Sequence, residues 1–68
     1  MKQLTMYKAR SPHMITFSPD PEDNFFVNVD IKKVRTGEVK ASHYILRSDV
    51  PQWTGMYEKD GFEIVTKF

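Results

Sequence analysis

The sequence predicts an α+β fold, in which a small antiparallel sheet of about five strands in the order ββββαβ contains a central β-hairpin and is joined by one short helix. Three observations predict it. Apolar residues occupy every second position over 25–31 and again over 39–45, with the turn residues Thr36-Gly37 between them. A helix start follows at 49–52, and strand-like alternation returns over 62–68.

The first two strands are expected near the amino terminus. Residues 3–8 alternate between apolar and polar side chains, which is typical of a strand with one buried face. Arg10-Ser11-Pro12 interrupts the pattern, and the alternation resumes over 13–17 with Ile15 and Phe17 on one face. The sequence therefore predicts two strands before the hairpin.

A loop is predicted over 18–24. Two prolines and three acidic residues fall within these seven positions. Proline has no backbone donor, and its fixed φ angle suits turns. We expect this loop to be the most exposed and mobile part of the chain.

The register of the central hairpin depends on the length of its loop. A two-residue loop at Thr36-Gly37 would mix apolar and polar side chains on each face. A three-residue loop, 35–37, with Gly37 in the left-handed region, instead pairs Val27 with Ile45 and keeps one face apolar. We therefore expect the odd-numbered side chains to point inward.

The helix is expected to begin at Asp49, which can cap it, and Pro51 falls in the first turn, where its missing N–H group does no harm. Trp53 and Tyr57 lie four positions apart and share a face. Asp60-Gly61 ends the helix after about two turns. A segment this short needs Trp53 to dock on the sheet.

The predicted core draws its apolar side chains from all five strands and the helix. Each large side chain contributes about 1.5–3 kcal/mol when it is fully buried. The expected members are Leu4, Met6, Ile15, Phe17, Phe25, Val27, Val29, Ile31, Val39, Ile45, Trp53, Phe62 and Ile64.

Length and composition limit the possible classes of protein. The 68 residues suffice for one domain, 1–68, and contain no cysteine to form a disulfide or a thiolate metal site. The formal net charge of +1 is unlike the basic excess of most nucleic-acid binders. No signal-peptide pattern and no apolar stretch of about 20 residues is present, so we expect a cytoplasmic protein without a membrane partner.

Candidate chemistry is sparse, and we predict no enzymatic activity. His13 and His43 are the only histidines and lack the spacing of metal ligands, so neither a metal nor a cofactor is expected. Ser42 precedes His43 directly, and on a strand their side chains point to opposite faces. The three glycines are dispersed and form no phosphate-binding loop. We therefore expect no catalytic residues.

The even-numbered face of the hairpin suggests two binding functions. The first is a protein-interaction module, such as an adaptor, an inhibitor or an assembly subunit, since one short helix cannot cover this many large side chains. Its partner would be another protein or a second copy of the chain. The expected contact residues are Phe26, Tyr44, Leu46, Met56 and Tyr57.

The second hypothesis is a small binder of single-stranded nucleic acid, which would combine aromatic stacking with phosphate neutralisation. It uses the same aromatic residues together with neighbouring cations, and the expected register sets Lys32 opposite Lys40. The cations concerned are Lys32, Lys40, Arg35 and Arg47. Against both hypotheses stands a simpler alternative, in which the helix that carries Trp53 covers this face.

The second half of the chain also resembles a group of small proteins. It consists of a long hairpin, a short helix and a closing strand that begins Gly61-Phe62-Glu63-Ile64-Val65. This arrangement is similar to that of small phage-encoded proteins that bind and inhibit host factors. The likeness covers 24–68 and lies in the pattern of elements, not in a motif. It implies a binding protein, and it assigns a role to no residue.

Overall fold

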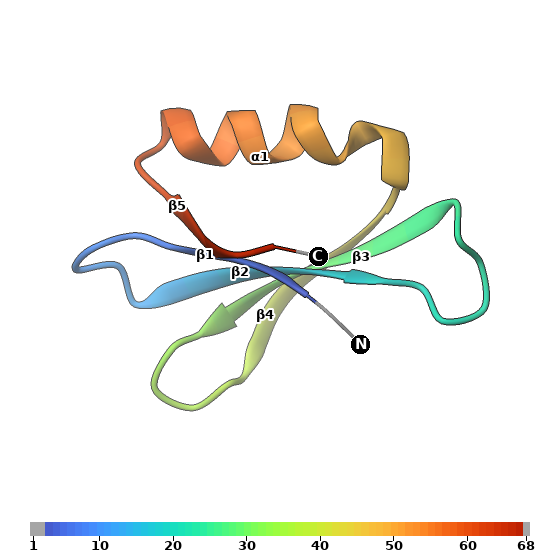
Figure 1. The fold of residues 1–68 in the computed structure, drawn as a ribbon. Helices are drawn as coiled ribbons and strands as arrows, with labels where there is room; N and C mark the ends of the chain where they lie inside the picture. The colour runs from blue at the N-terminus through green and yellow to red at the C-terminus, as the bar shows by residue number, and fades with distance from the viewer. Residues whose placement is uncertain (1–2, 68) are drawn as a thin grey trace.

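The computed structural model describes residues 3–67, and its first four strands form an antiparallel meander. A 3-10 turn and a helix follow, and the fifth strand pairs with the first, so the sheet order is β4-β3-β2-β1-β5. The helix therefore crosses the sheet from one edge to the other (Figure 1). The elements are β1 (Leu4–Tyr7), β2 (His13–Pro19), β3 (Phe26–Lys33), β4 (Val39–Leu46), η1 (Arg47–Asp49), α1 (Val50–Lys59) and β5 (Glu63–Thr66).

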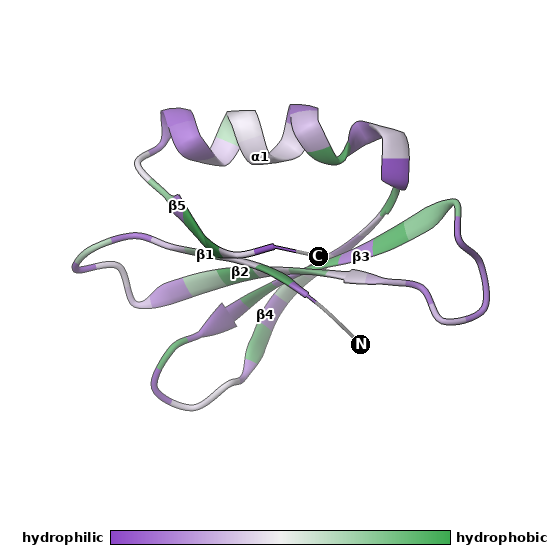
Figure 2. Cartoon of the chain, in the orientation of Figure 1, coloured by the Kyte–Doolittle hydropathy of each residue, from purple (hydrophilic) through white to green (hydrophobic). Residues whose placement is uncertain are grey.

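This architecture confirms the predicted α+β class and the order ββββαβ. All the strand pairs are antiparallel, and the helix lies over one face of the sheet (Figure 1). The core lies between that face and the helix, with Trp53 and Tyr57 packed against it from above. Hydrophobic strand segments run beneath the helix in Figure 2. The buried hydrophobic residues are Leu4, Met6, Ile15, Phe17, Val27, Val29, Ile45 and Val50.

The hairpin register confirms the expected strand parity along most of its length. Val27 pairs with Ile45, and both side chains are buried on the face beneath the helix. Phe26 pairs with Leu46 on the opposite face, as expected. The side chains of the odd-numbered positions thus turn towards the helix, and those of the even-numbered positions turn away from it.

The turn of the hairpin differs from the prediction. A β-bulge displaces the register beyond Ile31, so Lys32 pairs with Val39, and the expected pairing of Lys32 with Lys40 is wrong. The loop has four residues rather than three, because the Lys33 N–H donates to the Glu38 carbonyl at 2.8 Å. Gly37 does adopt the expected left-handed conformation, with φ of 76°.

Two expected core residues are exposed. Phe25 is 75% exposed because it precedes β3, in a turn where its N–H donates to the Asp23 carboxylate. Val39 is 47% exposed because the bulge pairs it with Lys32, away from the apolar row. Val50, which is absent from the predicted core, is buried at the start of the helix. Phe68, expected to continue the last strand, lies outside the described residues.

The helix begins where expected, by a different device. Asp49 occupies the N-cap position, but its side chain makes no capping hydrogen bond. The preceding η1 turn takes up this role in part, since the N–H group of Val50 bonds to the Arg47 carbonyl. The helix has ten residues rather than two turns and ends before Gly61, whose φ is 101°. No helix within residues 3–67 is both long and apolar enough to cross a membrane.

The acidic loop between β2 and β3 is held by local hydrogen bonds. The Asp20 carboxylate accepts from the Glu22 N–H at 2.9 Å, and the Asp23 carboxylate accepts from the Phe25 N–H at the same distance. Such turns are typical of aspartate. Most of this loop is hydrophilic in Figure 2, and it lies at the end of the sheet where α1 begins.

Candidate functional site

Within residues 3–67, no helix lies above one face of the sheet, and we call this the open face (Figure 1). A row of hydroxyl and carboxylate side chains crosses its middle, one from each strand. The Ser42 hydroxyl donates to the Asp30 carboxylate at 2.7 Å within this row. In sheet order the row consists of Ser42, Asp30, Thr16, Thr5 and Thr66.

A cluster of three large side chains lies on the open face beside this polar row. The Phe26 and Tyr44 rings are stacked, with centroids 4.7 Å apart and planes within 5° of parallel. Leu46 pairs directly with Phe26 on the neighbouring strand. Tyr44 is 54% exposed and Leu46 is 45% exposed. These three residues form the Phe26–Tyr44–Leu46 cluster, which is both ordered and accessible.

Two tethers from the acidic loop hold this cluster in place. The Tyr44 hydroxyl donates to the Asp20 carboxylate, and the Arg47 Nε–H donates to the Asn24 carbonyl at 2.8 Å. The hydrogen bond from Tyr44 lowers the pKa of Asp20, because it stabilises the charged carboxylate. The same bond raises the pKa of Tyr44 to about 12, since it requires the protonated phenol. The loop predicted to be mobile thus contacts the hairpin at two points.

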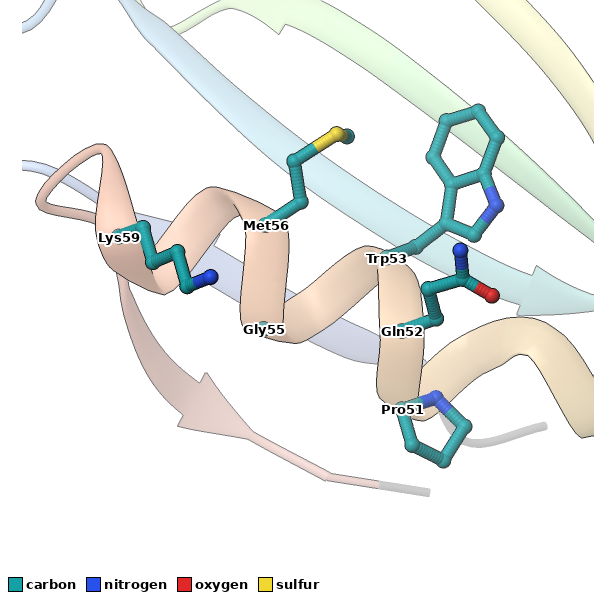
Figure 3. Close-up of a pocket in the computed structure, with 6 residues that line it drawn as sticks. All are labelled: Pro51, Gln52, Trp53, Gly55, Met56 and Lys59. Carbon is teal, nitrogen blue, oxygen red and sulfur yellow. The ribbon is translucent and has the colours of Figure 1, made fainter.

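The two helix residues of the predicted site lie elsewhere. Tyr57 is half-buried between helix and sheet, where its ring meets those of Phe17 at 6.3 Å and Phe62 at 6.0 Å. Met56 is 51% exposed on the helix and lines a hollow beside Trp53. Figure 3 shows Met56 and Trp53 projecting from the same side of the helix. The structure therefore brings three of the five predicted partner-binding residues together.

Trp53 serves as the expected anchor of the helix. Its ring lies 5.1 Å from the ring of His43, which points to the helix side of β4. The inward parity of His43 in the hairpin predicts a half-buried side chain with one hydrogen-bond partner. His43 is exposed instead, because β4 is the end strand of the sheet.

The four cations of the nucleic-acid hypothesis do not form one surface. Lys40 makes an ion pair with Glu38 at 3.8 Å, and Arg35 lies in the hairpin loop. Arg47 follows the other end of β4, an eight-residue strand of about 27 Å at 3.4 Å per residue. Phosphate binding along one track would need these charges side by side. The arrangement favours the aromatic cluster as the candidate site.

Charge is segregated along the strand direction, a feature that the strand pattern alone did not predict. The hairpin turn and the β1–β2 turn share one end of the sheet, and the β2–β3 loop and η1 share the other (Figure 1). The turn residues in the sequence were sufficient to find this pattern. The first end carries Lys8, Arg10, Lys32, Lys33, Arg35, Lys40 and Glu38 close to the two strand turns, and the α1–β5 turn at this end adds Glu58, Lys59, Asp60 and Glu63. The second end carries Asp20, Glu22, Asp23, Asp49 and Arg47.

The basic end also contains a hollow. Its volume is about 560 Å³, and His13 and Lys33, which pair across β2 and β3, both contribute to it. The other lining residues are Pro12, Arg35 and Thr36. These side chains could attract an anion to this end of the sheet through charge alone.

Within residues 3–67, no three histidine, aspartate or glutamate side chains are grouped so that they could hold a metal ion. Ser42 and His43 lie on opposite faces of β4, as the strand geometry predicts. Comparisons of the chain with models of known protein families, with curated protein sequences and with solved structures found no match.

Proposed function

We propose that this protein is a non-enzymatic interaction module that binds a partner protein through the Phe26–Tyr44–Leu46 cluster. The observation that carries the proposal is a stacked aromatic pair and an exposed leucine, fixed on the open face of the sheet. Tyrosine and other large side chains dominate the energetics of protein interfaces. An adaptor, an inhibitor or a subunit of an assembly would each use such a surface.

The cluster is suited to binding because little of it has to be ordered on contact. Phe26 and Tyr44 are stacked in the free chain, and the Asp20 hydrogen bond fixes the tyrosine ring. Immobilising a flexible interface side chain costs about 0.5–1.5 kcal/mol, and a fixed side chain avoids most of that cost. Ser42 and Asp30, the members of the polar row on the two hairpin strands, are accessible and offer hydrogen-bonding groups of the kind found at interface rims.

A capture experiment with purified variants tests the proposal. Leu46→Ser and Tyr44→Ser each remove apolar area from the cluster, while Met56→Ser makes a comparable change on the helix, where the side chain is equally exposed. We expect the cluster variants to lose at least tenfold in capture of a stoichiometric partner protein from lysate treated with nuclease. Met56→Ser should capture that partner as the unmodified chain does.

Two results would contradict this proposal. Equal capture by the Leu46→Ser and unmodified chains would exclude the cluster as the contact. Binding to a single-stranded oligonucleotide that weakens steeply with salt, and that Lys32→Glu with Lys40→Glu abolishes, would favour the nucleic-acid function instead. An apolar protein interface should change little between 50 and 200 mM salt, values chosen to span the range where counterion release is pronounced.

A further inference from the structure

β4 has the largest share of exposed residues among the strands of the sheet. It is the end strand of the sheet, and seven of its eight residues are exposed. The Arg47 N–H, two positions beyond Ile45 along the same ladder, donates to the Phe25 carbonyl at 2.7 Å. Because backbone groups alternate in direction along a strand, the odd-numbered residues bond to β3. The N–H and C=O groups of Ser42, Tyr44 and Leu46 therefore point to the free edge.

The free edge of β4 lacks the devices that usually prevent strands from pairing. The stretch 41–46 contains no charge and no proline, and its bulge and lysine lie outside it, near the turn. An unprotected strand edge of this kind is a template for another strand. The opposite edge is different, since β5 has four residues, carries Glu63 and is interrupted by a register shift. Of the two edges that the described residues form, the β4 edge is thus the one open to pairing.

We propose that two copies of this chain associate through β4 in antiparallel pairing, about a two-fold axis at Tyr44, to form a continuous ten-stranded sheet. Antiparallel pairing of a strand with itself keeps side chains of the same parity opposite each other. Both helices then lie on one side and both open faces on the other. Because β5 resists pairing, the assembly closes at two copies.

Charge complementarity favours a second copy as the occupant. Antiparallel pairing sets the basic hairpin end of one copy beside the acidic end of the other, where the β2–β3 loop and η1 lie. The net charge of the chain is only +1, so repulsion between copies is weak. The separation of basic and acidic residues at opposite ends of the sheet thus brings opposite charges together across a two-fold axis.

The side chains of β4 place the axis at Tyr44. In this register Ser42 lies opposite Leu46 of the second copy, and the two tyrosines extend the Phe26 stack into one aromatic row. Aromatic cross-strand pairs are favourable. An axis at His43 would instead place the two His43 Cα atoms about 4.5 Å apart, the spacing of a non-hydrogen-bonded pair. That arrangement would also set Tyr44 opposite Ser42 of the second copy, so the aromatic pair would be lost.

Mass measurement and cysteine cross-linking test this inference. We expect light scattering to give twice the mass of the 8.0 kDa chain at high micromolar concentration. The chain has no cysteine, so a single introduced thiol reports one distance. Tyr44→Cys should form an intermolecular disulfide under mild oxidation, since paired residues at about 5.5 Å fall within disulfide range. Ser42→Cys is the control, because its copies lie four positions out of register, about 14 Å apart.

Other outcomes would overturn the inference. A mass of one chain at every concentration would exclude the dimer, and a mass above two chains would exclude closure. Cross-linking of His43→Cys in preference to Tyr44→Cys would exclude the proposed axis. Tyr44→Lys should abolish the doubled mass, because it places two lysines at the axis. Asn28→Lys introduces the same charge one strand further in, opposite Tyr44 on the open face, and should preserve the doubled mass. A doubled mass for Tyr44→Lys, or its loss in Asn28→Lys, would also contradict the proposal.

The inference does not depend on the proposed function. A monomeric chain could still capture a partner through the Phe26–Tyr44–Leu46 cluster. Conversely, if the Leu46→Ser and unmodified chains capture alike, the proposed function fails while the mass and the Tyr44→Cys disulfide still report the dimer. The two results are read from different measurements.

Discussion

Gly37 sets the geometry of the hairpin turn through its backbone. Its φ of 76° lies in the left-handed region, and an added Cβ would meet no atom within 4 Å. Gly37→Ala therefore introduces backbone strain alone, and we expect it to lower the free energy of unfolding by about 1–2 kcal/mol. Urea denaturation measures this. Gly37→Asn should cost less, because asparagine tolerates this region better, and an unchanged midpoint for Gly37→Ala would contradict the turn geometry.

The Tyr44–Asp20 hydrogen bond predicts a pH dependence at both ends of the scale. The bond raises the pKa of Tyr44 from 10.0 to about 12, so its stabilising effect is present below pH 10 and is lost as the pH rises towards 12. The pKa of Asp20 is lowered from 3.8, so the effect is also lost as the pH falls below that value.

Asp20→Asn should return the pKa of Tyr44 towards 10. Ultraviolet absorbance of the tyrosinate ion, followed from pH 8 to 13, measures this shift. Tyr44→Phe is the control, because it removes the phenol whose titration is being assigned. If Asp20→Asn and the unmodified chain titrate identically, the tether between the acidic loop and the hairpin is excluded.

Among the elements, α1 offers a matched comparison between neighbouring side chains. Tyr57 contacts Phe17 and Phe62 beneath the helix, whereas Met56 is half-exposed on its surface. Tyr57→Ala leaves a gap in this aromatic packing, and we expect it to lower the free energy of unfolding by about 2–4 kcal/mol. Met56→Ala should change it by less than about 0.5 kcal/mol. Chemical denaturation monitored by circular dichroism compares them, and equal losses would contradict the described helix face.

At the scale of the whole molecule, self-association predicts a stability that depends on concentration. A dimer is favoured by mass action, so its thermal midpoint should rise with protein concentration. Scanning calorimetry from 10 μM to 1 mM measures this for the unmodified chain and for Tyr44→Lys. We expect the dependence in the first and not in the second. A midpoint independent of concentration in both would argue for a monomer.

The sequence predicted the parts of this fold that depend on strict alternation. A slip of one residue in the hairpin would have turned Val27 and Val29 outward, so the apolar pattern specifies the register strongly. The bulge at Lys40 left no such signal, because either parity exposes the residues there, and Val39 was misplaced as a result. The residue types in α1 predicted a helix but not how deeply each side chain is buried. The half-buried Tyr57 and the exposed Met56 were therefore both predicted as contact residues.

The pairing of β5 with β1 joins opposite ends of the described chain, and this has a consequence for motion in the native state. Met6 pairs with Ile64, so this contact closes a loop that spans most of the chain and costs more entropy than the local turns of the meander. β5 is also the shortest edge and is largely exposed. Its amide protons should exchange with solvent deuterium well before those of β2 and β3, because the strand can detach while the meander stays folded. Detachment would briefly expose the edge of β1. A cross-link between β5 and β1 would slow this detachment without changing the Phe26–Tyr44–Leu46 cluster on the open face.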